Sequence, residues 1–435
     1  MGAGLYFNER LSTPIFLILM IYFIQRIIIV PSSEKTRAVL LGCAYFVGVE
    51  VIFRITRAGI SYEASKYLVV LFMLMGMFFK GISGKGYPYF IYLIALVPAI
   101  LVASVTLTFD ANFRTNVTFV LSGPICLGIA ALFCYDRNVS RKTLLDVNLY
   151  FLLPTIALTT YLFFYTPSIK DLLSSVASNR ATSGGFGPNQ VATALGLGMF
   201  AMAVRLFLQS PGILLKLFNL GIFAAISYRA IVTFSRGGVV AAIIVIIAFL
   251  WTIYYRSSRN QKNQIVGSVI LLVIAAAFTW VLSSNQTSGL IDNRYTNKDS
   301  RGREKGDFST GRLELFKQEI EGFLSSPFLG VGASRTKNKR FDEKGAVIAS
   351  HNEIGRLLSE HGMLGFLIIA ILIIKPLTYR SNNKSNFMFY AFLAFWFATI
   401  NHSGMRIAAP SFLYAMSLIN VVNEKHPLHR KQLKN

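Results

Sequence analysis

The chain has 435 residues, of which 54% are hydrophobic and only 14% are charged. Soluble domains carry about 25% charged residues, so this composition excludes an ordinary soluble protein and indicates a polytopic membrane protein. The mean hydropathy of +0.53 also indicates a membrane protein. The net charge of +23 invites a nucleic-acid interpretation. However, the Lys and Arg residues are scattered over many short connections, so positive-inside bias and anionic lipid headgroups explain the excess, and no nucleic-acid partner is expected.

Apolar runs long enough to span a bilayer recur along nearly the whole chain. They predict an all-α polytopic membrane protein with about 12–13 transmembrane helices, organised as a single membrane domain over residues 1–435. The first run lacks a basic region and a cleavage site, which favours a retained span over a signal peptide. The expected spans are 13–31, 38–54, 66–83, 88–105, 117–135, 143–165, 188–208, 212–233, 237–255, 264–283, 362–380, 387–401 and 408–423.

Short basic loops predict the orientation of these spans, because such loops face the cytoplasm. The basic connections are residues 136–142, 205–216 and 256–262 and the tail 424–435. Placing them inside puts an outer loop at 166–187 and a large periplasmic loop at 284–361. The N-terminal half fits less well, because the same count places Arg54, Arg57 and Lys66 outside, against the rule.

The 284–361 loop is expected to contain amphipathic helices. Ser309-Thr310-Gly311-Arg312-Leu313-Glu314 opens a run with helical spacing of apolar residues, which stops at Pro327-Phe328-Leu329-Gly330-Val331-Gly332. Thr310 is the expected N-cap, so Arg312 would lie in the first turn, where free backbone N–H groups and the helix dipole favour an anion. The alternative is an interfacial helix that exposes one arginine.

A second helix start is predicted at Ser350-His351-Asn352-Glu353, which fits a capping box with Ser350 as N-cap and Glu353 as N3. His351 would then lie at the helix start, where the dipole and a nearby arginine disfavour the imidazolium. The neutral imidazole can accept a proton. The alternative is a structural histidine. His361, at the other end of this helix, is expected to be a C-terminal capping group.

Two further polar turns lie on the predicted outer side. In Ser235-Arg236-Gly237-Gly238 the glycines permit close backbone approach and the guanidinium can bind a phosphate through two hydrogen bonds. A tight interhelical turn is the alternative. The other turn runs from Arg180 through Gly185-Phe186-Gly187-Pro188-Asn189, where Pro188 can begin a helix. A substrate-contacting loop and a plain turn both remain open there, and Arg180, Asn189 and Asn352 are candidate contacts.

Metal and nucleophile motifs are not seen in the sequence. The outer loops contain no HExxH, CxxC or Asp-x-Asp motif, so no catalytic metal or other cofactor is expected. No serine-histidine-aspartate arrangement is visible either. Any chemistry therefore falls to arginines and a histidine.

Taken in order, these outer-side motifs resemble the O-antigen ligase and O-antigen polymerase family of bacterial envelopes. The matching motifs are Gly185-Phe186-Gly187-Pro188-Asn189, Ser235-Arg236-Gly237-Gly238, Thr310-Gly311-Arg312 with Pro327-Phe328-Leu329-Gly330-Val331-Gly332, and Ser350-His351-Asn352 with Glu360-His361-Gly362. The resemblance covers about Arg180 to Gly365, and each motif alone is weakly specific.

The resemblance implies a membrane glycosyltransferase of the bacterial inner membrane, with its active site facing the periplasm. The implied partners are an undecaprenyl-diphosphate-linked glycan donor, a glycan or lipid A-core acceptor, and membrane lipids. It also implies metal-independent transfer with inversion, in which Arg236 and Arg312 bind the diphosphate and His351 acts on the acceptor hydroxyl. Members that glycosylate protein often carry a soluble C-terminal extension, and the short segment after the last span argues against that branch.

Two other functions stay open at this point. A repeat-unit polymerase shares the donor chemistry of a ligase, and the sequence does not separate the two. A transporter for the same lipid-linked glycan is a different class, kept open by Arg26 and Arg229 inside or near spans. A purely structural scaffold would not need two arginines and a histidine at helix starts on one side.

Overall fold

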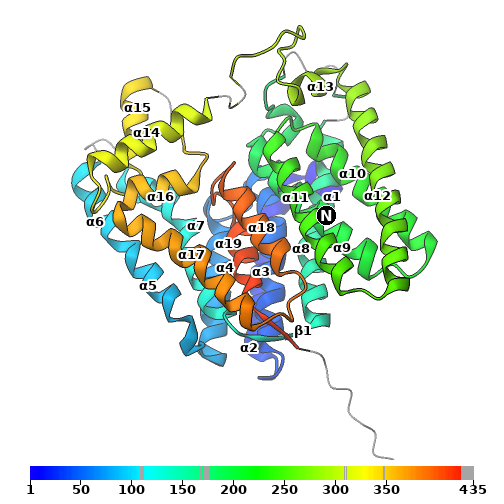
Figure 1. The fold of residues 1–435 in the computed structure, drawn as a ribbon, viewed down its shortest axis with the longest axis horizontal. Helices are drawn as coiled ribbons and strands as arrows, with labels where there is room; N and C mark the ends of the chain where they lie inside the picture. The colour runs from blue at the N-terminus through cyan, green and yellow to red at the C-terminus, as the bar shows by residue number, and fades with distance from the viewer. Residues whose placement is uncertain are drawn as a thin grey trace, which may run out of the picture.

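The computed structural model describes residues 1–107, 112–166, 168–169, 176–307, 309, 311–345 and 348–422, drawn in Figure 1. Within these residues the chain is a bundle of α-helices with two three-residue strands, β1 (Asn138–Ser140) and β2 (Asn420–Val422). The predicted all-α membrane fold is therefore confirmed. The predicted N-cap Thr310 and the basic tail 424–435 lie outside the described residues.

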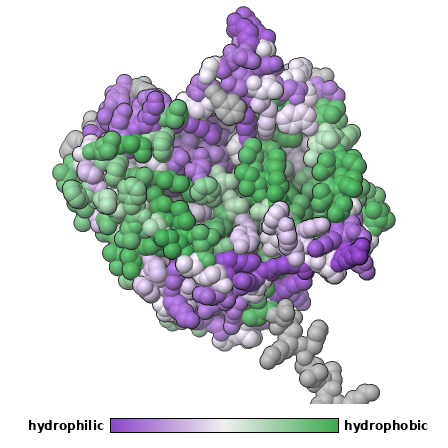
Figure 2. Space-filling view, in the orientation of Figure 1, coloured by the Kyte–Doolittle hydropathy of each residue, from purple (hydrophilic) through white to green (hydrophobic). Residues whose placement is uncertain are grey.

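Helices lie at all of the predicted spans. Ten segments of the described chain are long and apolar enough to cross a membrane. Figure 2 shows the corresponding apolar band between two hydrophilic ends of the molecule. The helices of the bundle are α2 (Ser12–Ile29), α3 (Lys35–Ile55), α4 (Ala64–Lys80), α5 (Tyr87–Ala95), α6 (Val97–Thr106), α7 (Phe113–Cys134), α8 (Arg141–Tyr165), α9 (Pro188–Leu208), α10 (Ile213–Ile231), α11 (Arg236–Arg256), α12 (Arg259–Gln286), α17 (Met363–Asn382), α18 (Phe389–Ile400) and α19 (Ala408–Ser417).

Four of the expected spans depart from a plain long helix. The run 88–105 forms two helices, α5 and α6, because Pro98 stands at the start of α6 and cannot donate a backbone hydrogen bond. Helices α4, α18 and α19 have only 17, 12 and 10 residues. Every residue of α19 is buried. A short helix is stable at membrane depth when protein surrounds its ends.

Small residues allow the central helices to approach each other closely. A Cβ atom on Gly48 of α3 would lie 2.4 Å from the carbonyl oxygen of Phe151 in α8. A Cβ atom on Gly238 of α11 would lie 2.5 Å from the Cβ of Ala192 in α9. Such contacts are typical of membrane helix pairs, where van der Waals packing replaces the hydrophobic effect as the driving force. Helices α3, α8, α9 and α11 thus form a rigid framework.

The loops predicted to share the cytoplasmic side do lie together on one face, at the lower end of Figure 1. Strands β1 and β2 pair in parallel there, with Asn138 opposite Asn420. The guanidinium of Arg256 donates a hydrogen bond to the carbonyl oxygen of Ser385 at 3.1 Å. We call this end the basic face, and the opposite end, which carries the 284–361 segment, the site face.

Two of the three basic residues that conflicted with the orientation rule, Arg54 and Lys66, form ion pairs. Arg54 forms ion pairs with Glu50 at 2.6 Å and with Glu63 at 3.0 Å. Lys66 forms an ion pair with Glu63 at 2.6 Å. Because their charges are paired and buried, Arg54 and Lys66 add little net positive charge to the site face. At the N-terminus, the hydroxyl of Tyr161 in α8 donates to Glu9 at 2.8 Å, on the same side as the site face.

Four shorter helices cover the site face, as expected for the 284–361 segment (Figure 1). They are α13 (Leu290–Tyr295), α14 (Arg312–Ser325), α15 (Arg335–Lys344) and α16 (Glu353–His361). The remaining elements are helix α1 (Gly2–Phe7) and the short 3-10 turns η1 (Glu9–Leu11), η2 (Gly84–Gly86) and η4 (Ala181–Ser183).

Candidate active site

Arg312 is the first residue of α14, as the sequence predicted. The N-cap position is Gly311, whose φ of 80° lies in the left-handed region that favours glycine. Asp307 supports this start, because its carboxylate accepts a hydrogen bond from the backbone N–H of Gly311 at 2.6 Å. The predicted N-cap, Thr310, is therefore wrong by one position, and Thr310 itself lies outside the described residues.

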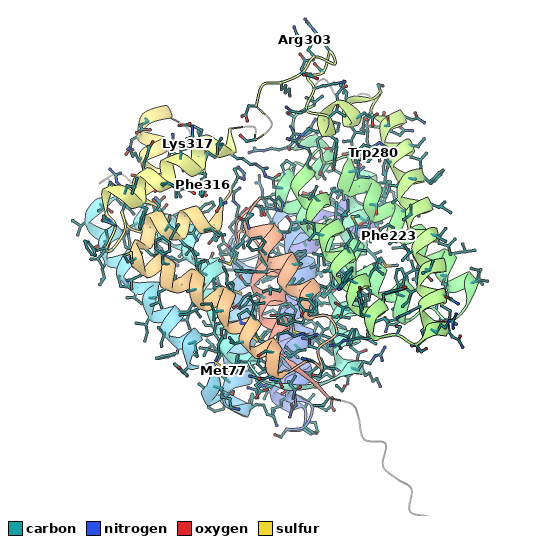
Figure 3. The ribbon with its side chains drawn as sticks, in the orientation of Figure 1. Met77, Phe223, Trp280, Arg303, Phe316 and Lys317 are labelled. Atoms are coloured by element: carbon teal, nitrogen blue, oxygen red, sulfur yellow. The ribbon has the colours of Figure 1, made fainter. Side chains whose placement is uncertain are left out.

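Helix α14 is amphipathic and rests on α16. Phe316 projects toward α16 and Lys317 projects away from it (Figure 3). A Cβ atom on Gly355 of α16 would lie 2.8 Å from the ring of Phe316, so glycine is needed at this contact. Beneath the helix, the buried carboxylate of Glu319 forms an ion pair with Arg340 at 3.1 Å. Burial raises the pKa of Glu319 to about 7.

The predicted capping box at the start of α16 is wrong. The N-cap is Asn352, whose Oδ1 accepts a hydrogen bond from the backbone N–H of Gly355 at 2.9 Å. Ser350 instead donates to the carbonyl oxygen of Asn352 at 2.8 Å, and Glu353 forms an ion pair with Arg356. The carboxylate of Glu353 is drawn into this buried pair and does not return to the helix start. His351 therefore precedes the helix and remains free to line a cavity.

The Pro327–Gly332 turn joins the two helices. The backbone N–H of Val331 donates to the carbonyl oxygen of Ser359 in α16 at 2.9 Å, and that of Met363 donates to Pro327 at 2.7 Å. A Cβ atom on Gly330 would lie 2.4 Å from the backbone of Glu360. The glycine-containing motif thus fixes the end of α14 against the end of α16, which holds Arg312 and His351 in a constant relation.

Arg312 and His351 line the same cavity, of about 260 Å³, between α14 and the segment before α16. Its other lining residues are Ser309, Leu313, Leu315, Phe316, Glu319, Ser350, Asn352 and Asn401. Sequence reasoning could not show that these two residues lie together, since they are 39 positions apart in the chain. The fold does so.

Arg236 is the first residue of α11, and its guanidinium donates to the carbonyl oxygen of Arg294 at 3.3 Å. Arg294 in turn donates to the carbonyl oxygen of Phe234 at 3.1 Å. Burial and then the positive charges of Arg236 and Arg312 lower the pKa of Arg294. Burial and the charge of Arg236 lower the pKa of Arg312. These three guanidinium groups are therefore close enough to repel one another.

His351 faces a second pair of residues that follow α18. Its Nδ1 lies 3.3 Å from the carbonyl oxygen of His402, and Arg406 donates to the carbonyl oxygen of the neighbouring Ser350 at 2.7 Å. Burial, followed by the charges of Arg406 and Arg312, lowers the pKa of His351 to about 3. The imidazole is thus neutral near pH 7. Burial, which the sequence did not indicate, is the largest cause, and the nearby arginines that the sequence analysis invoked add to it.

His402 fills the space between this loop and the start of α11. A Cβ atom on Gly237 would lie 2.2 Å from the His402 ring, which explains why glycine follows Arg236. The Nε2 of His402 lies 3.4 Å from the hydroxyl of Thr193 in α9. Burial and the charge of Arg312 lower the pKa of His402 to about 4, so this ring is also neutral. His402 is a packing link between Arg236 and His351.

The three candidate contact residues, Arg180, Asn189 and Asn352, lie at different distances from the site. Asn189 accepts a hydrogen bond from the hydroxyl of Ser235 at 2.7 Å, beside Arg236. Asn352 lines the cavity of Arg312 and His351. Arg180 is exposed at the start of η4, and it does not line that cavity. The structure thus brings Asn189 and Asn352 to the site and leaves Arg180 at its surface.

Two arginines of the site were missed in the sequence. Arg294 lies in a segment with several other basic residues, and nothing in its pattern distinguishes it from them. Arg406 follows Asn401-His402-Ser403-Gly404-Met405, a polar turn between two apolar runs, which was a usable signal. His361, predicted to be a C-terminal capping group, is the last residue of α16 and is buried, and burial lowers its pKa to about 3.

Across the parts of the chain that the structure describes, no three His, Cys, Asp or Glu side chains gather as a metal site would require. The residues nearest to Arg312 and His351 are cationic, neutral polar or apolar, apart from Glu319.

A many-helix membrane fold that brings Arg312 and His351 to one cavity on its site face defines the class of polytopic membrane proteins. Residues 221–370 match the family model described as O-antigen ligase. This region, which contains Arg236, Arg312 and His351, is similar to that family, and the resemblance seen in the sequence is confirmed. No curated protein matches the chain. The protein is thus a membrane protein of O-antigen ligase or polymerase type that processes glycans.

Proposed function

We propose that the protein is a glycosyltransferase that moves a glycan from an undecaprenyl-diphosphate carrier to a hydroxyl acceptor, lipid A-core or a similar glycan. The observation that carries this proposal is the cavity in which Arg312 and His351 meet, with Arg236 and Arg406 near enough to alter their electrostatics. A neutral imidazole beside the guanidinium groups of Arg312 and Arg406 suits a reaction that deprotonates a hydroxyl and releases a diphosphate.

In this proposal Arg236 and Arg312 bind the diphosphate of the donor. A guanidinium group matches two phosphate oxygens through parallel hydrogen bonds, which a lysine cannot do. Arg294 lies near both arginines, since the charges of Arg236 and Arg312 both lower its pKa. The positive charge would stabilise the leaving group as its bond to the sugar breaks, a role that a metal ion plays in other transferases.

The chemical step is a single displacement at the anomeric carbon. The oxygen of the acceptor hydroxyl attacks that carbon, and the bond to the diphosphate oxygen breaks with its electron pair staying on the diphosphate. The hydroxyl proton passes to His351, and the configuration at the anomeric carbon inverts. His351 can accept this proton at Nε2, because Nδ1 lies against the carbonyl oxygen of His402, which can only accept a hydrogen bond.

Donor binding would adjust the basicity of His351. Its pKa is low partly because of the charges of Arg406 and Arg312. A diphosphate bound at Arg236 and Arg312 offsets part of this positive charge, so the pKa of the imidazole rises once the donor is in place. The histidine is therefore a stronger base in the complex than in the empty site.

The proposed orientation places this site in the periplasm and the protein in the inner membrane. Support comes from the basic face, where the loops rich in Lys and Arg gather at the end opposite α14 and α16 (Figure 1). The arginines offered for transport do not lie at midmembrane. Arg229, near the end of α10, donates to the carbonyl oxygen of Thr182 at 3.0 Å, and Arg26 lies in the last turn of α2. Both have local structural roles.

A repeat-unit polymerase would use the same site, and the acceptor separates the two functions. The test is the length profile of lipid-linked and cell-surface glycan after deletion of the gene. A ligase predicts full-length glycan that accumulates on the carrier and is missing from the cell surface. Single repeat units in place of long chains identify a polymerase. An unchanged profile in both pools contradicts the proposal.

A further inference from the structure

A second cavity lies at the basic face, on the side of the molecule opposite the candidate active site. It has a volume of about 930 Å³ and is bounded by the α9–α10 turn, the α11–α12 turn and the segment before α18. Hydrophilic side chains gather at this end of the molecule in Figure 2. Nothing in the proposed glycan transfer uses this cavity.

The polar lining of this cavity is basic. Arg141, Lys216 and Arg256 contribute to its wall, and no residue that lines it is acidic. Lys216 donates to the hydroxyl of Ser268 at 3.3 Å, and the guanidinium of Arg141 lies over the ring of Phe387 at 5.4 Å. Among the described residues, neither cation forms an ion pair with a carboxylate. Two cations without a counterion among the described residues therefore face one open cavity.

Neutral hydrogen-bonding groups complete the wall. Ser257, Gln261 and Gln264 line the cavity beside the basic residues. Gln209 also lines it, and among the described residues the buried Oε1 atom of Gln209 has no hydrogen-bond partner. A buried oxygen without a donor is costly, so a ligand that brings a hydroxyl or amine group would satisfy it.

The surroundings of the cavity indicate that its ligand has a lipid part. Phe207, Leu208 and Ile265 supply apolar wall on the inner side. The two helices at its edge, α10 and α12, expose apolar side chains above it, among them Leu217 and Ile270, 51% and 55% exposed. A headgroup in the cavity would thus have its acyl chains against these helices, at the level of the bilayer.

We propose that this cavity binds the headgroup of an anionic phospholipid from the membrane leaflet on the basic face. The headgroup phosphate would lie between Arg141 and Lys216, and a headgroup hydroxyl would reach Gln209. Basic pockets between membrane helices on the cytoplasmic side are known to recognise acidic lipid headgroups. A bound lipid would bridge α10 and α12, the latter of which has few buried residues, Ser268, Leu272, Ala275, Thr279 and Ser283.

The test is native mass spectrometry of the full-length protein from micelles that contain phosphatidylglycerol or phosphatidylcholine with the same acyl chains. The wild-type protein should retain phosphatidylglycerol preferentially. The double variant Arg141→Gln/Lys216→Gln should bind it about 30-fold more weakly, since each basic side chain near an anionic headgroup contributes a factor of about five. Lys142→Gln/Lys384→Gln removes two exposed charges of the same face outside the cavity, and it should bind as the wild type does.

Equal loss in the two double variants would overturn the proposal in favour of general surface charge, as would equal retention of the two lipids by the wild type. If Arg141→Gln/Lys216→Gln fails to fold, Gln264→Trp tests the cavity by filling it from an exposed position on α12, and unaltered lipid retention would then overturn the site. A second arm adds inorganic phosphate. If the lipid is released only by a competing lipid, the proposal is supported. If millimolar inorganic phosphate alone stabilises the protein and no lipid is retained, the lipid assignment is overturned.

Discussion

The Nδ1 atom of His351 lies 3.3 Å from the carbonyl oxygen of His402. A carbonyl oxygen can only accept a hydrogen bond, so this contact places the proton of the neutral imidazole on Nδ1 and leaves Nε2 with its lone pair. The same His402 has its ring against Gly237, next to Arg236. One buried residue thus connects the proposed base with the proposed diphosphate-binding arginine.

Replacement of His351, the proposed base, should strongly reduce glycan transfer but leave donor binding intact. In His351→Ala the arginines remain, so the donor should still bind, while transfer should fall by about 10²–10⁴-fold because the hydroxyl proton has no acceptor. The measurement is single-turnover transfer together with donor affinity in detergent. Unchanged transfer in a variant with the wild-type unfolding midpoint would rule out the proposed role of His351.

Replacement of one arginine by lysine should be harmful although the charge is kept. Arg312→Lys loses the two parallel hydrogen bonds to the diphosphate, and kcat/KM for the donor should fall on the order of 10²-fold. The matched control is Arg303→Lys, on the same face, where the side chain is 71% exposed and pairs with Asp299 at 2.7 Å. If the two lysine variants have equal activity, a diffuse basic surface is the better explanation.

The profile of kcat/KM against pH should not show an acidic limb, which is the loss of rate that protonation of a histidine of ordinary pKa causes as the pH falls. With a pKa of about 3, His351 stays unprotonated between pH 8 and pH 5, so it causes no loss of rate in that range. An imidazole of ordinary pKa would cost about 30-fold by pH 5. Arg406→Gln removes the neighbouring charge that lowers this pKa most, so the limb should move to higher pH. A limb centred near pH 6.5 in the wild type contradicts this environment of His351.

The glycine after Arg236 should be sensitive to a single added methyl group. In Gly237→Ala the new Cβ would lie 2.2 Å from the His402 ring, so the ring must shift, and we expect a loss of about 1–3 kcal/mol of stability with reduced transfer. Gly221→Ala is the control, because α10 leaves open space around Gly221. The stability of Gly221→Ala should equal that of the wild-type protein or exceed it by up to about 1 kcal/mol. Thermal unfolding of both variants measures this difference, and equal midpoints would argue against the contact.

The positions of the helices could be predicted well because membrane spans leave a strong apolar signal. Pro188 was expected to open a span, and it is the first residue of α9. The start of α14 at Arg312 was also predicted. The capping box at Ser350 failed because the pattern shows only local spacing, whereas the carboxylate of Glu353 is held by Arg356 inside the structure.

The sequence could not predict that the site residues lie close together. The contacts of His351 with the 402–406 turn join segments about fifty residues apart, and no periodicity predicts such a contact. The conflict over Arg54 and Lys66 had a similar origin, because loop charge was counted without knowledge of the buried partners Glu50 and Glu63. Charge counting works for exposed residues and fails where the fold pairs them.

The central claim is best tested with the purified protein in liposomes that contain the undecaprenyl-diphosphate-linked glycan, an acceptor and a metal chelator. Arginine-based stabilisation of the leaving group predicts that the elongated or ligated product and free undecaprenyl diphosphate appear in equal amounts, and that neither appears with His351→Ala. Product formation only after addition of a divalent metal, or no release of undecaprenyl diphosphate by the wild-type protein, would contradict the account.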